Sequence, residues 1–242
     1  EVIALDDLSS GRRENLDGLA VPLVVGSILD DGVLDRVMRG ADAVVHLGAR
    51  PSVPRSIAEP TATHEANATG TVKVLEAARR HGVGHVVVAS SSSVYGANPE
   101  LPKRESQVPM PVSPYAVSKL ATEQYALAWQ HSFGLPTLAF RFFNVFGPRQ
   151  AVGHAYAAVV PAFVDAALRG IAATVHGDGT QSRDFTSVRS VCEVIADALV
   201  RRVSHTGPVN LAFGSRVTLL ELLSSIESVV GRPVEREHVA TR

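Results

Sequence analysis

The stretch HVVVASSSSVYG, residues 85–96, joins an apolar run of strand length to a cluster of hydroxyl side chains. The run from His85 to Ala89 is rich in valine and too short to form a separate helix, so we predict a fully buried strand. Similar runs occur at Val21 to Val25, Ala43 to Leu47 and Thr137 to Phe142. Segments with helical spacing lie between them, at Asp30 to Met38, Pro60 to His81 and Ser113 to Phe133. Strands that alternate with helices indicate an α/β fold with a parallel sheet covered on both faces.

The pattern loosens after Phe146, where we expect a smaller mixed region. Its predicted elements are a helix from Ala157 to Arg169, a strand from Ala173 to His176, helices near Ser190 to Arg202 and Thr218 to Val230, and a short strand from Val209 to Leu211.

The composition limits the possible functions. The chain has 242 residues, a formal charge of -1 and 19% charged positions, so capture of nucleic acid or an anionic membrane by charge is not expected. No run approaches eighteen apolar residues and the start, EVIALDDLSS, lacks the zones of a signal peptide, which favours a soluble protein. The single cysteine, Cys192, allows no internal disulfide and suits a reducing cytoplasm, and we expect it to be a small core residue.

An acidic side chain, Asp6, follows the short apolar run from Val2 to Leu5. In dinucleotide-binding folds, an acid at the carboxyl end of a strand binds the adenosine ribose hydroxyls. The glycine-rich phosphate loop lies about 20 residues before that acid, which here falls before residue 1. Two interpretations stay open: the chain lacks the first strand, glycine loop and first helix of such a fold, or Asp6 is only a turn residue.

The sequence YAVSK, residues 115–119, places a phenol and an ammonium on one helix face. We expect Lys119 to favour the phenolate and lower the pKa of Tyr115, which would make a general acid/base near neutral pH. The serines at 90–93 follow a strand, where ligands bind in open α/β sheets. Chance surface spacing and a polar turn are the alternatives, but the combination with Asp6 favours a catalytic site.

Other notable side chains have simpler interpretations. His46 is predicted to be a packed core histidine, because no metal-binding cluster surrounds it, and we expect no metal site. Tyr125 and Trp129 are expected to pack along the helix that carries Tyr115. The pair at 12–13, two arginines, is either solvated or touches a 2′-phosphate, whereas Asp6 favours NAD over NADP.

These motifs, in their order, resemble the extended short-chain dehydrogenase/reductase family and, within it, the nucleotide-sugar 4-epimerases. The resemblance covers essentially the whole chain. The stretches that carry it are LDDLSSG (5–11), VHLGA (45–49), SVPRS (52–56), NATGT (67–71), SSSSVYG (90–96), SPYAVSK (113–119), RFFNVFGP (141–148) and GDG through RDF (177–185).

The resemblance implies a Rossmann-type doubly wound sheet without its first strand and glycine-rich loop. It implies an NAD-binding domain over residues 1–146, a smaller substrate-binding region over 147–242 that is shortened at its C-terminal end, and a cytoplasmic homodimer through the two helices Pro60 to His81 and Ser113 to Phe133.

The resemblance also assigns residues. Ser91 would hydrogen-bond the sugar O4, Tyr115 would be the base, and Lys119 would tune it and hold the nicotinamide ribose. The implied cofactor-binding residues are Asp6, Asp7, Ser9, Ser10, Gly11, Ser27, Ile28, Leu47, Gly48, Ala49, Asn67, Ser90, Tyr115, Lys119 and Phe142. The implied substrate-binding residues are Ser52, Val53, Ser91, Asn144, Val159, Thr174, His176, Arg183 and Arg242.

The implied reaction is NAD-dependent epimerisation at C4 of a UDP-hexose or UDP-N-acetylhexosamine through a 4-keto sugar. Dehydratases of the family usually carry an acidic residue just after the Ser/Thr, where this chain has Ser92 and Ser93. The alternatives are a nucleotide-sugar 4-ketoreductase or dehydratase of the same family, or a non-catalytic relative that only binds sugar nucleotides.

Overall fold

The computed structural model describes residues 1–151 and 158–240. The chain divides into two compact units. Unit 1 comprises Glu1–Phe142 and Glu193–Asn210, and unit 2 comprises Phe143–Cys192 and Leu211–Arg242. The first unit is therefore built from two separate stretches of the chain.

Unit 1 contains the main sheet, with the strand order β10-β5-β4-β3. Strands β3 (Val44–His46), β4 (Val86–Ser91) and β5 (Thr137–Phe142) run parallel, and β10 (Val209–Leu211) lies beside β5. A second parallel pair is formed by β1 (Ala4–Asp6) and β2 (Leu23–Val25). Three successive valines of β4, residues 86–88, are completely buried, as expected for a central strand with both faces covered.

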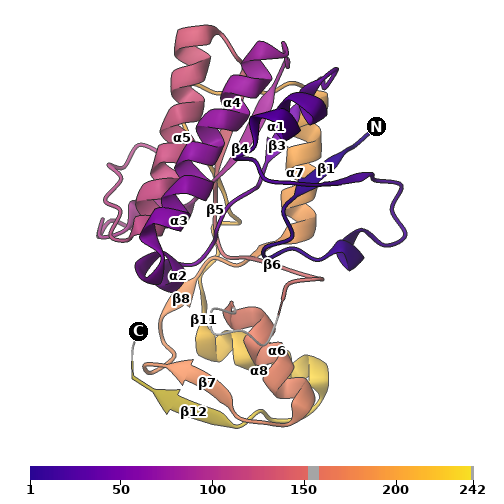
Figure 1. Ribbon diagram of the computed structural model, residues 1–242. Helices are drawn as coiled ribbons and strands as arrows, with labels where there is room; N and C mark the ends of the chain where they lie inside the picture. Colours follow the sequence, from indigo (N-terminus) through magenta and orange to yellow (C-terminus); the bar gives the residue numbers. More distant parts are fainter. Residues whose placement is uncertain (152–157, 241–242) are drawn as a thin grey trace. The chain divides into compact units, whose positions relative to one another are not determined.

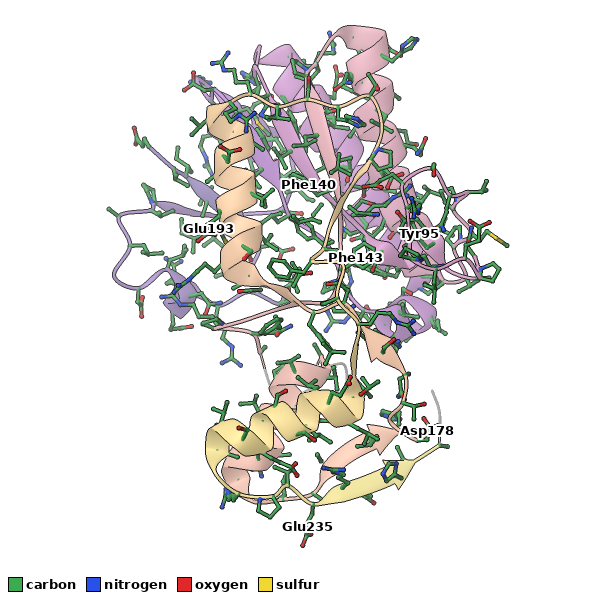
Figure 2. All side chains as sticks on the ribbon, turned by 180° about the vertical axis from the view of Figure 1, so that it is seen from behind. Tyr95, Phe140, Phe143, Asp178, Glu193 and Glu235 are labelled. Atoms are coloured by element: carbon green, nitrogen blue, oxygen red, sulfur yellow. The ribbon has the colours of Figure 1, made fainter. Side chains whose placement is uncertain are left out.

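Helices cover the two faces of this sheet (Figures 1 and 2). Helices α4 (Gly70–Arg80) and α5 (Pro114–Phe133) lie on one face, and the part of α7 (Val188–Val200) that belongs to unit 1 lies on the other. Helix α1 (Asp31–Met38) packs against α4, and a π-helical turn (Glu65–Thr69) joins α3 (Pro60–His64) to α4. Helix α2 (Val53–Ala58) and two 3-10 turns (Arg13–Leu16 and Ser92–Tyr95) complete the described helical elements of unit 1.

Local sequence signals fix the ends of α5, the longest helix described. The Ser113 Oγ accepts a hydrogen bond from the backbone N–H of Ala116 at 3.1 Å, and Pro114 occupies the first helical position. The helix ends at Gly134, whose φ of 67° is the left-handed conformation that glycine adopts at little cost. Tyr115 and Lys119 therefore lie in the first two turns of this helix.

Unit 2 has its own small core. The parallel pair β7 (Ala173–His176) and β12 (Arg236–Val239) lies beside helices α6 (Val159–Arg169) and α8 (Leu219–Val230), with Phe163, Val175 and Leu223 buried among them. Short pairs link the loops: β6 (Val145–Phe146) with β9 (Thr186–Ser187), and β8 (Ser182–Arg183) with β11 (Val217–Thr218).

The α/β class and the parallel sheet predicted from the sequence are confirmed. Helix α2 and strand β12 had not been predicted, and the predicted start of the helix at Ala157 lies outside the described residues. The expectation that Cys192 is a core residue is wrong, because its side chain is exposed. Within the described ranges, none of the helices is long and apolar enough to cross a membrane.

Candidate active site

The predicted catalytic residues come together at the carboxyl end of β4. Ser91 is the last residue of β4, and its side chain hydrogen-bonds to that of Tyr115 in the first turn of α5. Lys119 lies one turn further along the same helix, and its Nζ donates a 2.6 Å hydrogen bond to the carbonyl oxygen of Ala89. A hydroxyl, a phenol and an ammonium therefore lie on adjacent elements at the same end of the sheet.

Burial sets the protonation of this group. It lowers the pKa of Lys119 to about 8, so the ammonium remains mostly protonated at neutral pH. It raises the pKa of the Tyr115 phenol, and the hydrogen bond with Ser91 opposes this only in part. The expectation that Lys119 lowers the pKa of Tyr115 is therefore wrong for the chain alone, because loss of solvent dominates.

A buried polar network lies beneath the site. Asn67, in the π-helical turn, accepts a hydrogen bond from the Arg50 backbone N–H at 2.7 Å and donates to Ser118 on α5 at 2.9 Å. His46 contacts Thr71 at 3.0 Å, and burial lowers the pKa of its imidazole to about 3, so it stays neutral. His46 is a packed core residue, as predicted, and the Asn67 side chain holds the loop after β3 to α5.

The residues expected around a dinucleotide lie in the loops after β1, β2 and β3. Asp6 ends β1 and accepts a 2.7 Å hydrogen bond from the Leu8 backbone N–H, while Asp7 accepts from Ser9. A Cβ on Gly11 would lie 2.9 Å from both carboxylate oxygens of Asp6, so a larger residue at position 11 would displace this carboxylate. Residues Ser27, Ile28, Leu47, Gly48, Ala49, Ser90 and Phe142 follow or end the neighbouring strands, and Ser10 lies in the loop after β1.

These side chains fit NAD. Asp6 is exposed at the end of its strand and offers carboxylate oxygens to ribose hydroxyls. Lys119 is buried, yet among the described residues its ammonium donates only to Ala89, which leaves further N–H donors for a second ribose. Acceptor and donor therefore match the two ends of a dinucleotide.

Unit 2 contains a pocket of about 660 Å³. It is lined by Asn144, Val159, Thr174, His176, Gly177, Asp178, Thr180, Gln181, Arg183 and Leu219. The pocket therefore gathers Asn144, Val159, Thr174, His176 and Arg183, which the sequence had suggested as substrate-binding residues. Ser52 and Val53 begin α2 in unit 1, where Ser52 adopts a left-handed φ of 93°, and Arg242 lies outside the described residues.

The remaining lining residues were missed by the sequence analysis. Asp178, labelled in Figure 2, sits in the turn after β7, and hydrogen bonds from Thr180 hold the pKa of its carboxyl below the usual range. The Gln181 Nε2 donates to the carbonyl of His176 at 2.6 Å, which closes the turn. The Gly-Asp-Gly stretch is one of the motifs that carry the resemblance, but the sequence did not show that it lines a pocket.

Comparison with known proteins identifies the family. The model of the "NAD dependent epimerase/dehydratase family" matches residues 1–212. The chain belongs to this family. Its cofactor, named in the family's description, is NAD, in agreement with the prediction from Asp6. Among curated members, the UDP-glucose 4-epimerase of Mycolicibacterium smegmatis is 37% identical over 98% of this chain and 77% of its own length.

Solved structures of epimerases share the fold along the whole chain. The UDP-N-acetylglucosamine 4-epimerase of Methanobrevibacter ruminantium, in complex with UDP-N-acetylmuramic acid, is 35% identical, with a TM-score of 0.95 over 100% of this chain and 78% of that one. The UDP-glucose 4-epimerase of Thermus thermophilus, in complex with NAD, is 34% identical, with a TM-score of 0.90. The match covers 100% of this chain and 79% of that one. The Rossmann-type architecture predicted from the motifs is thus confirmed.

Proposed function

We propose that this epimerase/dehydratase family member is a nucleotide-sugar 4-epimerase that inverts C4 of a UDP-hexose or UDP-N-acetylhexosamine through a 4-keto sugar. The observation that carries the proposal is the Ser91–Tyr115 hydrogen bond at the end of β4, with Lys119 one helical turn away. The names of the relatives, UDP-glucose 4-epimerase and UDP-N-acetylglucosamine 4-epimerase, support C4 chemistry on a UDP sugar.

Unit 1 would hold NAD, with Asp6 at the adenosine ribose and Lys119 at the nicotinamide ribose. NAD, when bound, takes up the hydride of C4 and returns it to the opposite face of the sugar. The residues of the chain move the proton. In the chain alone burial favours the neutral phenol of Tyr115, so its phenolate would form only when the positive charges of Lys119 and of bound NAD favour it. That phenolate would accept the proton of the 4-hydroxyl and later give it back. Ser91, which is hydrogen-bonded to Tyr115, would also hydrogen-bond O4 and so hold the 4-hydroxyl beside the phenol oxygen.

The substrate has to be held by its nucleotide, because the sugar must present both faces of C4 in turn. The unit 2 pocket suits this task. Arg183 carries a guanidinium that can bind a phosphate through two parallel hydrogen bonds, and Asn144 lies in the same pocket.

The family's alternative reactions differ in the step after oxidation. A dehydratase needs a further acid to eliminate water, whereas residues 92 and 93 are serines. A 4-ketoreductase would consume one reduced cofactor per turnover, and a non-catalytic relative would bind UDP sugars without converting them.

We also propose a cytoplasmic homodimer. Three apolar side chains of α5 remain exposed in unit 1: Val117 at 53%, Tyr125 at 40% and Phe133 at 52%. A second copy that packs against the helical segments Pro60 to His81 and Ser113 to Phe133 would remove such side chains from water. Light scattering of the eluted protein should then give twice the 25.6 kDa chain mass, and a single chain mass would refute the dimer.

The chemistry is tested by replacing Tyr115 with Phe. We expect kcat to fall by at least about 100-fold, since a positioned acid/base contributes roughly 10²- to 10⁴-fold, while UDP-sugar affinity by calorimetry stays within a few-fold. The matched control is Tyr125→Phe on the same helix, which should keep normal turnover. Parental turnover in the Tyr115 variant would remove this residue from the mechanism.

A further inference from the structure

An ion pair behind the catalytic group is shielded from solvent on both sides. Glu123 on α5 is 0% exposed and Arg141 on β5 is 2% exposed. Two parallel hydrogen bonds join them, Nε to Oε2 at 2.8 Å and Nη2 to Oε1 at 2.7 Å. A buried ion pair seldom stabilises a fold more than apolar residues of the same volume would. Stability alone therefore does not explain this pair, whereas the positioning of neighbouring groups can.

The pair is connected to Lys119 through one hydroxyl. The Ser90 Oγ lies 3.0 Å from Glu123 Oε2 and 3.3 Å from the carbonyl oxygen of Lys119. The preceding residue, Ala89, accepts the hydrogen bond from the Lys119 ammonium at 2.6 Å. Three successive residues of β4, at 89–91, thus contact the Lys119 ammonium, the Lys119 backbone and the Tyr115 phenol.

The other face of Arg141 is fixed as well. Its guanidinium lies 4.7 Å from the ring centre of Tyr95, and the Tyr95 hydroxyl donates to Asn210 at 2.7 Å. Tyr95, labelled in Figure 2, ends the serine turn after β4. Arg141 on β5, Tyr95 in the turn after β4 and Asn210 on β10 therefore together fix the position of the Glu123 carboxylate.

We propose that Glu123 and Arg141 are positioning residues for the reaction: through Ser90 they fix the turn of α5 that carries Tyr115 and Lys119 against the end of β4. The inference rests on the proposed function for its kinetic consequence only. It also gives Ser90 a role in its own right, because its hydroxyl is directed to Glu123 and α5.

A purely structural pair would strengthen the α5 contact without affecting the ammonium of Lys119. The two possibilities predict different pKa values for Lys119 in the variants. This pKa can be measured by NMR because the chain has few lysines. Lysines occur at positions 73, 103 and 119, so a protein with 13C at lysine Cε gives three side-chain NMR signals. The titratable groups near Lys119 are Tyr115, one turn earlier on the same helix, and His46 from β3. The Glu123–Arg141 pair is linked only to the backbone carbonyl of Lys119, through Ser90.

The experiment compares Ser90→Ala and Glu123→Gln with a matched control, Thr137→Val. Thr137 is also completely buried and donates to the Ala126 carbonyl at 3.1 Å, so the control removes a β5–α5 hydrogen bond far from the site. In the parent protein Lys119 should titrate near its expected pKa of about 8. In the Ser90 variant this pKa should fall by about one pH unit, because α5 is no longer fixed to β4 through Ser90 and the hydrogen bond of the ammonium to the Ala89 carbonyl weakens.

The kinetic arm uses UDP-glucose as the probe. The Ser90 variant should lose on the order of tenfold or more in kcat with KM within about twofold, because small misplacements of reacting groups are costly. Thr137→Val should match the parent in both the titration and kcat. A Lys119 titration in Ser90→Ala that matches that of the control would overturn the proposal, even if Glu123→Gln does not fold.

Failure of the proposed function would look different. If the parent converts no nucleotide sugar, the epimerase assignment fails, yet the Lys119 titration still decides whether the ion pair positions this turn.

Discussion

Breaking the buried ion pair should be far more costly than removing it entirely. Arg141→Met leaves the Glu123 carboxylate in a site with 0% exposure and without its guanidinium partner. The loss of one partner of a buried pair costs about 3–5 kcal/mol. Domains of this kind unfold with about 5–15 kcal/mol, so this single change would remove a large part of the total.

The double variant Glu123→Leu with Arg141→Met removes both charges and refills the space with apolar atoms. Its stability should lie within about 1–2 kcal/mol of the parent, apart from the Ser90 hydroxyl that keeps only its Lys119 partner. Urea unfolding, followed by the fluorescence of the single tryptophan Trp129, measures the free energy of unfolding of the single and the double variant. A single-variant loss below about 1 kcal/mol, or a double variant that loses as much as Arg141→Met alone, would refute the reasoning.

Two further predictions concern His46 and Gly96. The folded pKa of His46, about 3, lies below its ordinary value of 6.5, so the unfolded chain binds the proton first and stability falls as pH drops below 6.5. The loss should be roughly 1.4 kcal/mol per pH unit, and His46→Gln should show a shallower acid limb in unfolding titrations. Gly96→Ala should cost roughly 3 kcal/mol, because a Cβ would lie 1.9 Å from the Met110 carbonyl oxygen at a φ of 46°. Acid limbs of equal slope in the parent protein and in His46→Gln would contradict the first expectation. An unchanged melting temperature of Gly96→Ala would contradict the second.

The sequence predicted the parts of the fold that depend on local patterns. The valine run of β4 and the Ser113-Pro114 start of α5 are enough to place Ser91 next to Tyr115, because the carboxyl ends of parallel strands and the helix starts that come after them share one edge. Strand β12 was missed because its residues, REHV, carry charges and lack an apolar face; only its pairing with β7 makes it a strand.

Properties that depend on burial were harder to predict. The spacing of Tyr115 and Lys119 suggested a lowered phenol pKa, but the degree of burial, which the spacing does not contain, reverses the direction. Glu123 and Arg141 are 18 residues apart on a helix and a strand, and their pairing depends on how α5 packs against β5. The pocket residues of unit 2 likewise meet only after β7, β8 and α8 have assembled.

The most direct test of the central claim is to follow the configuration at C4 by NMR. The protein, without added cofactor, would be incubated with UDP-glucose, UDP-galactose and their N-acetyl counterparts in separate samples. We predict that each accepted sugar converts to its C4 epimer until equilibrium is reached, without net consumption of NAD. Unchanged C4 signals in all samples would contradict the epimerase assignment, and consumption of added NADH by a 4-keto sugar in a separate sample would favour a ketoreductase.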